Sequence, residues 1–416
     1  MRVPFHATDT RILFLSRAIR LFAYGLLSVV LVFYLVDLGL SEKQVGLLLS
    51  LTLVGDTLIS LWLTTHADRI GRKRTLLLGA LLMIGAGAVF ASAGSFLVLL
   101  CAAIVGVISP SGNEVGPFLS VEQASLAELV PSHHRTQTFA WYNLLGSFTT
   151  AGGALASGFI LQFLQAAANL TTSQSYRGIV VIYGAFGLLL FAILSGLSGS
   201  IETKHPIDRD SLKTRWLGLT RSRRFVLGLS ALFALDAFAG GFIIQSILAY
   251  WFHVKFGIDI KWIGTIFFGA NILAGISALS AARVARRFGL LNTMVFTHLP
   301  SNLLLILVPF MPNITFAIAL LLLRFSISQM DVPTRQSYTM AVVDKEERSA
   351  AAGITNVART IGASLAPVIA APCLVVPALF NAPFFIAGGL KIIYDLILYR
   401  AFRSTIPAEE IGPTRT

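Results

Sequence analysis

The stretch TTHADRIGRKR occupies residues 64–74 and lies between two long apolar runs, 43–64 and 75–93. About 20 apolar residues are enough for one helix to cross the hydrocarbon core of a membrane. A short basic loop between two such runs is typical of two membrane-spanning helices joined by a tight turn, which Gly71 permits. The stretch therefore predicts a helical membrane protein, with this loop on the side where positive charge collects.

Apolar runs of similar length fill the rest of the chain. Hydrophobic residues make up 55% of the 416 residues and charged residues only 12%, about half the charged share of a soluble protein. This composition excludes a water-soluble enzyme, a nucleic-acid-binding module and a disulfide scaffold. Twelve spans are expected, the fourth of them bent at Pro110 and Pro117. They are 12–36, 43–64, 75–93, 96–127, 137–165, 178–200, 225–252, 261–284, 293–311, 314–333, 350–376 and 382–402.

The 32 Lys and Arg residues are distributed unevenly over the loops. With the N-terminus in the cytoplasm, most of them lie in cytoplasmic segments. The opposite side holds only Lys43, Arg177, Lys255 and Lys261. The positive-inside rule therefore places both termini in the cytoplasm. Compact loops and short termini fit a multi-pass protein of a bacterial cytoplasmic membrane.

The chain divides at its longest polar stretch. Residues 201–224 are expected to form a cytoplasmic linker between an N-terminal half (1–200) and a C-terminal half (225–416) of six spans each. The halves also repeat weakly, because an offset of 213 residues aligns Arg135 with Arg348 and Asn143 with Asn356. Parallel repeats of this kind are common in transporters. The predicted fold class is an all-α membrane protein with 12 transmembrane helices in two pseudo-symmetric six-helix bundles.

The loop at 64–74 resembles the signature of the major facilitator superfamily, which reads Gly, three residues, then Asp-Arg-x-Gly-Arg-Arg/Lys. One position departs, because Thr64 stands where the family has Gly. The loop after the eighth span carries a degenerate echo at 285–289. Together with the twelve spans and the central linker, the resemblance covers essentially the whole chain. It implies the fold of this family and transport by alternating access of the two halves.

The resemblance also implies a latch on the cytoplasmic side. In the family, the loop acid faces the positive N-terminus of span eleven, and the loop Arg pairs with an acid ending span four, here Arg72 with Glu128. A second-half counterpart is expected at Arg335, with Glu346 and Glu347. The alternative that the basic residues only set the topology stays open. The residues assigned to the latch are Asp68, Arg69, Gly71, Arg72, Lys73, Glu128 and Arg135.

Two signatures of the family's drug–proton antiporters are missing. Those proteins carry an Arg in the middle of span four, whereas residues 107–118 contain no basic residue. They also carry a Gly-Pro in span five, whereas residues 146–158 contain small residues and no Pro. The motifs therefore do not support drug–proton exchange.

Ionisable residues inside a span are costly and are candidates for function. Asp236 and Arg359 both lie about 15 Å from the cytoplasmic face by helical rise, so we expect them to form a pair or opposite walls of a cavity. The same measure allows a pair between Arg20 and Asp56. The candidate proton or substrate residues are Asp236, Glu114, Asp56, Arg359, Arg324, Arg20, Asn143 and Asn356.

Several of the buried polar residues have competing interpretations. Glu114 has no basic neighbour in its own helix, and it either binds a proton or caps broken backbone. Lys391 and Asp395 are spaced i, i+4 and can neutralise each other. His298 has no carboxylate or Cys at metal-ligand spacing. We expect neither a metal site nor a cofactor.

These patterns predict a monomeric secondary transporter that moves a small solute, with the proton gradient as driving force. Glu114, Asp236 and Asp56 are the proton carriers to test, and family base rates favour export. One alternative is an uncoupled facilitator of organic or inorganic anions, for which Arg324, Arg359 and Arg20 supply a cationic cavity. The remote alternative is a non-transporting polytopic enzyme or sensor. No nucleophile–base constellation or soluble output domain supports it, and no enzymatic activity is expected.

Overall fold

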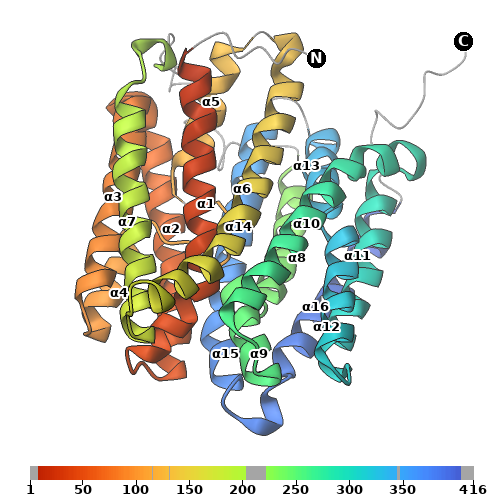
Figure 1. Cartoon of the computed structure of the whole chain (residues 1–416). Coiled ribbons are helices and arrows are strands. Elements are labelled where there is room, and N and C mark those ends of the chain that lie inside the picture. The colour runs from red at the N-terminus through yellow and green to blue at the C-terminus, as the bar shows by residue number, and fades with distance from the viewer. Residues whose placement is uncertain (1–7, 115, 131, 203–221, 344–346, 404–416) are drawn as a thin grey trace, which may run out of the picture. The chain divides into compact units, whose positions relative to one another are not determined.

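The computed structural model describes residues 8–114, 116–130, 132–202, 222–343 and 347–403. Over these ranges the chain is helical and contains no strand, which confirms the predicted all-α class (Figure 1). The helices are α1 (Thr8–Asp37), α2 (Glu42–Ile70), α3 (Arg72–Ser92), α4 (Phe96–Val105), α5 (Phe118–Leu129), α6 (Ser132–Ala166), α7 (Thr172–Ser195), η1 (Gly199–Ile201), α8 (Arg223–Gly241), α9 (Gln245–Phe256), α10 (Ile260–Phe288), α11 (Leu290–Leu307), η3 (Val308–Phe310), α12 (Ile314–Ser328), α13 (Asp331–Val342), α14 (Arg348–Leu365), α15 (Pro367–Cys373), η5 (Pro377–Leu379) and α16 (Ala382–Phe402).

The described residues contain 11 helical segments that are long and apolar enough to cross a membrane, and the shorter apolar helix α4. The prediction that one bent helix covers 96–127 is wrong. Helix α4 ends at Val105, and α5 begins only at Phe118. The cause is the sequence between them, where Pro110 and Pro117 lack a backbone N–H and Gly112 and Gly116 take positive φ angles of 70° and 80°. Span four is therefore interrupted by a non-helical segment, described at 106–114 and 116–117.

Contacts between Cα atoms divide the chain into two compact units. Unit 1 contains Met1–Pro206 and Ile244–Asn271, and unit 2 contains Ile207–Ile243 and Ile272–Thr416. Unit 1 therefore includes α9 and the first part of α10, which belong to the predicted second half of the chain. The predicted linker at 201–224 lies mostly outside the described residues, and the division into halves there stays a prediction.

Helix α1 forms the buried centre of unit 1 and packs against α6 and α7. Two glycines allow α1 and α6 to approach backbone to backbone. A Cβ atom on Gly25 would collide with the carbonyl oxygen of Thr150, and one on Gly153 with the carbonyl oxygen of Phe22. Because lipid offers no hydrophobic driving force between helices, close packing of this kind holds membrane helices together.

Unit 2 repeats this device with different residues. Helix α8 packs closely against α14. A Cβ atom on Gly241 would meet the carbonyl oxygen of Ala363, and one on Gly362 would meet the carbonyl oxygen of Ala234. In both units, two helices thus approach closely through one glycine on each of them, α1 with α6 in unit 1 and α8 with α14 in unit 2.

Candidate functional site

A buried cluster of four charged side chains lies on α1 of unit 1 and the interrupted span four. Arg20 donates from Nη1 and Nη2 to the two carboxylate oxygens of Glu122, each at 2.9 Å, and from Nε to Glu114 at 2.8 Å. Arg17 donates to the other oxygen of Glu114 at 2.7 Å. Tyr142 of α6 donates its hydroxyl to Glu122. The two cations and two anions balance, which is the condition for burying charge in a span.

This cluster corrects two expectations. Arg20 pairs with Glu114 and Glu122, so the pair with Asp56 is wrong. Glu114 lies in the non-helical segment and not inside a helix, and both of its cations come from α1. Glu122 was missed, although it is an acid within the predicted fourth span and meets the criterion that selected the others.

Asp56 of α2 lies in a different environment. Its Oδ1 accepts a bond from the backbone N–H of Gly116 at 2.5 Å and one from the Ser60 hydroxyl at 3.2 Å. Across the residues that the structure describes, its carboxylate makes no ion pair. Within the described residues, Asp56 is therefore a charge in a membrane span that is held by dipoles and by no cation.

The non-helical segment of span four contacts four helices of unit 1. Glu114 joins it to α1, and Gly116 joins it to Asp56 of α2. The carbonyl of Val107 accepts from Tyr183 of α7, and the carbonyl of Pro110 accepts from the backbone N–H of Ser246 in α9 at 3.3 Å. Irregular backbone at membrane depth needs such partners. Any change at this segment therefore reaches four helices at once.

Unit 2 contains a second buried cluster, centred on Asp236 of α8. The Oδ1 atom accepts from Lys391 of α16 at 2.5 Å. The Oδ2 atom accepts from Arg359 of α14 at 3.1 Å and from Arg335 of α13 at 3.3 Å. The predicted pairing of Asp236 with Arg359 is confirmed. Arg335, predicted as a second-half counterpart of the latch, is buried and donates to Asp331 at 2.9 Å. Its predicted partner Glu346 lies outside the described residues, so this part of the latch stays a prediction.

His298 of α11 extends this cluster. Its Nδ1 lies 2.9 Å from Asp395, and its Nε2 lies 3.9 Å from Asp236. Asn302 donates to the same Asp395 carboxylate at 3.0 Å. The predicted pairing of Lys391 with Asp395 is wrong, because each has a partner on a neighbouring helix. The sequence places no carboxylate near His298 along the chain, but the fold brings Asp395 and Asp236 beside it.

The remaining predicted site residues lie at varied positions. Asn143 is exposed on α6 and accepts a long bond of 3.4 Å from Arg17. Asn356 is exposed on α14. Arg324 is buried on α12, where its guanidinium carbon lies 5.1 Å from the ring centroid of Phe325. The structure therefore gathers most of the predicted charges into two clusters, whereas Arg324 makes no direct hydrogen bond or ion pair with a described member of either.

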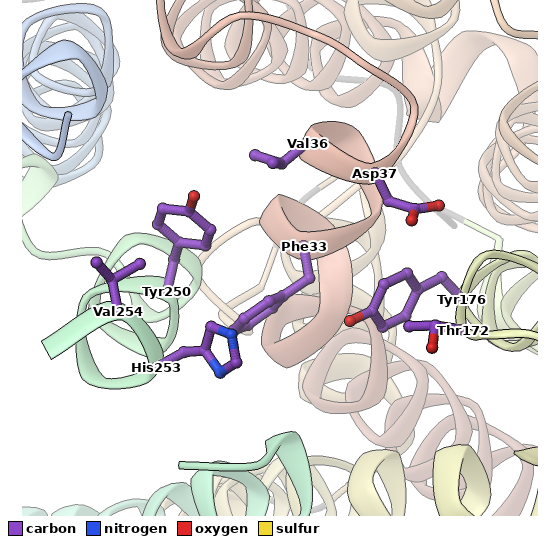
Figure 2. Close-up of a pocket in the computed structure, with 8 residues that line it drawn as sticks. All are labelled: Phe33, Val36, Asp37, Thr172, Tyr176, Tyr250, His253 and Val254. Carbon is purple, nitrogen blue, oxygen red and sulfur yellow. The ribbon is translucent and has the colours of Figure 1, made fainter. Parts of the chain in front are cut away.

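A recess of about 480 Å³ lies at the end of α1 in unit 1, bordered by α7 and α9. Figure 2 shows Phe33 between Tyr250 and His253 on one side and Tyr176 on the other, with the Asp37 carboxylate at the rim. The Phe33 ring meets Tyr250 and His253 edge-on, at centroid distances of 5.5 and 5.1 Å. None of the predicted site residues lines this recess.

The sequence and fold match known membrane transporters. The profile of the Major Facilitator Superfamily matches residues 13–367. The chain belongs to this superfamily.

An uncharacterized membrane protein of Saccharomyces cerevisiae, YJR124C, is 30% identical over 417 residues, covering 94% of this chain and 93% of that protein. The quinolone resistance protein NorA of Staphylococcus aureus is 28% identical over 167 residues, covering 40% and 39%. A D-xylose–proton symporter has a similar structure, with a TM-score of 0.75 at 15% identity, covering 96% of this chain and 98% of that one.

The superfamily loop connects α2 and α3 through Gly71, whose φ of 101° favours glycine. Glu202 accepts the backbone N–H groups of Arg72 and Lys73 at 2.7 and 3.2 Å and so caps the positive end of α3. The Lys73 ammonium donates to the carbonyls of Ser195 and Leu197 at 2.7 and 2.6 Å. This connection to the end of α7 was not predicted. The side chains of four predicted latch residues lie outside the described part, and the latch stays a prediction; they are Asp68, Arg69, Glu128 and Arg135.

Proposed function

We propose that this superfamily member is a proton-coupled secondary transporter of a small solute, with Asp56 as its proton carrier. The supporting observation is the difference among the three candidate acids. Glu114 faces two arginines, and Asp236 faces two arginines and a lysine. A proton arriving at either carboxylate must break ion pairs, whereas a proton arriving at Asp56 breaks none.

The contacts of Asp56 also provide a path from proton binding to helix movement. A neutral carboxyl group accepts a weaker hydrogen bond than a carboxylate does, so protonation loosens the bond from Gly116. The loosened segment carries Glu114, which holds Arg17 and Arg20 of α1. Proton uptake at α2 is thereby transmitted to the central helix of unit 1.

The direction and the membrane form part of the same proposal. Export is proposed because the partial similarity to NorA, a quinolone resistance protein, adds to the family base rates. Because the drug–proton signatures are missing, the similarity to NorA bears on the direction of transport and not on the class of solute. We place the protein in a plasma membrane as a monomer with both termini in the cytoplasm. The relatives come from a yeast and a bacterium, so a bacterial membrane stays a prediction.

A second candidate is an uncoupled facilitator of anions. It is favoured by Arg359, whose side chain is 30% exposed although its partner Asp236 is 5% exposed. An arginine that is only partly covered can accept an anion on its free side. Transport of an anion that persists without a proton gradient would support this candidate over the first.

The test of the proposal is a substitution of Asp56 by Asn in purified protein reconstituted into liposomes. The wild type is expected to move protons, reported by an internal pH-sensitive dye, when a quinolone is added. Asp56→Asn should reduce this proton movement at least about tenfold, since removing a transition essential to turnover costs at least that factor. Infrared difference spectra between acid and neutral pH give a substrate-free measurement, in which the variant should lose one protonated-carboxyl band.

Asp37→Asn is the matched control, because Asp37 is an exposed acid at the end of α1. It should retain both the proton movement and the infrared band. If Asp56→Asn keeps the infrared band of the wild type, Asp56 is not the proton site and the proposal is wrong, whichever solute is transported.

A further inference from the structure

Arg324 is a buried charge that forms no direct ion pair within the described residues, although Asp331 and Asp236 lie near enough to act on it through space. Its residue is 7% exposed, and across the described ranges it makes no hydrogen bond or ion pair. Its Nε atom is buried without a partner. The neighbouring ring of Phe325, at 5.1 Å, offers only a cation–π contact, which attracts the guanidinium but does not neutralise it.

The acids of unit 2 that lie within spans are already in use. Asp331 pairs with Arg335 at 2.9 Å. Asp236 forms ion pairs with three cations, and Asp395 is hydrogen-bonded to His298 and Asn302. Among the described residues within these spans, and leaving out His298, the three acids balance Arg335, Arg359 and Lys391, and Arg324 is the surplus positive charge.

A second unpaired donor lies on the same face of the helix. Ser328 is four residues after Arg324 on α12, a spacing that places two side chains one above the other. Ser328 is 4% exposed, and its hydroxyl is buried without a partner. Two buried donors, one of them charged, therefore lie within one helical turn and share no acceptor.

We propose that Arg324 and Ser328 form a binding site for an oxyanion, a carboxylate or phosphate group of a small solute. The planar guanidinium offers paired N–H donors that match the two oxygens of such a group. The Ser328 hydroxyl adds a neutral donor beside them. The negative charge of the solute balances the positive charge that the described span residues of unit 2 leave over.

This inference deepens the proposed transport function, because it gives the class of the solute, and to that extent it rests on it. Binding of the anion itself requires neither a proton gradient nor a complete transport cycle. A binding measurement on the purified full chain therefore tests the inference separately from Asp56.

The experiment measures thermal unfolding of the purified protein by intrinsic fluorescence. The buffer has constant ionic strength and contains a bulky sulfonate salt, into which acetate, benzoate or inorganic phosphate is titrated. We expect at least one of the three to raise the unfolding temperature of the wild type in a saturable way. Arg324→Gln should lower the apparent affinity at least about tenfold, and Ser328→Ala about threefold, the factors expected for a charged and a neutral hydrogen bond.

A second readout separates binding from a structural role. In the sulfonate buffer alone, Arg324→Met should unfold at the same or a higher temperature than the wild type, because it removes an uncompensated buried charge. Arg286→Gln, at an exposed arginine of α10, is the matched control and should respond to anions like the wild type. The inference is wrong if none of the three anions stabilises the wild type, if Arg324→Gln responds like the wild type, or if Arg324→Met is destabilised and the anion response is unchanged.

Discussion

Asp236→Asn is expected to destabilise unit 2 severely, because it leaves three cations around a neutral amide. Lys391, Arg359 and Arg335 all donate to this one carboxylate. Removing one member of a buried ion pair costs about 3–5 kcal/mol, since the remaining charge stays buried and uncompensated. The measurement is the unfolding temperature in detergent, together with the fraction of protein that elutes as a single symmetric peak.

This expectation differs from that of a dispensable carrier, whose amide variant folds normally and loses only transport. The double variant Asp236→Asn with Lys391→Met removes one of the three stranded cations and should recover part of the lost stability. Asp37→Asn, at an exposed acid, should unfold like the wild type. A single variant Asp236→Asn that is as stable as the wild type contradicts the central role of Asp236 in unit 2.

Gly153→Ala is expected to separate α6 from α1, because the added methyl group collides with the backbone carbonyl of Phe22. A backbone atom cannot turn aside as a side chain does, so the whole helix must shift. Overpacked sites usually cost about 1–3 kcal/mol and occasionally more, and a backbone collision belongs at the upper end. The unfolding temperature and the rate of solute-driven proton movement should both fall.

The adjacent residue supplies the control. A Cβ atom on Gly152 would lie 3.7 Å from the ring of Phe22, an ordinary van der Waals contact. Gly152→Ala should therefore leave both the unfolding temperature and transport near their wild-type values. Equal losses from the two substitutions would contradict a specific approach of α1 to α6 at Gly153, because helix propensity alone would make both alanines stabilising.

The fold was largely predictable because the membrane imposes one requirement along the whole chain. Every span needs a long apolar run, and the runs and basic loops are visible in the sequence. The interruption of span four was harder to predict, since Pro110 and Pro117 fit either a bent or a broken helix. The difference depends on whether neighbouring helices satisfy the freed backbone groups, as Asp56 does for Gly116.

The partners of the buried charges were less predictable, for a geometric reason. Helical rise gives the depth of a residue, and depth correctly brought Asp236 and Arg359 together. Depth does not give the direction in which a side chain points around its helix. Local spacing therefore favoured Lys391 with Asp395, whereas packing supplied both with partners on other helices.

The sequence separation within the charge clusters has a consequence for biosynthesis. Glu122, which accepts a hydrogen bond from Arg20, lies 102 residues after it in the chain. Lys391, which donates to Asp236, lies 155 residues after that acid. At about 5–20 residues per second, the ribosome adds Glu122 about 5–20 s after Arg20. During most of that interval the newly made α1 carries two arginines whose acceptors in the folded protein, Glu114 and Glu122, have not been synthesised. Delivery of α1 into lipid before span four is made therefore costs about 2.5–3.5 kcal/mol for each arginine at the centre of the span, and synthesis of span four relieves that cost.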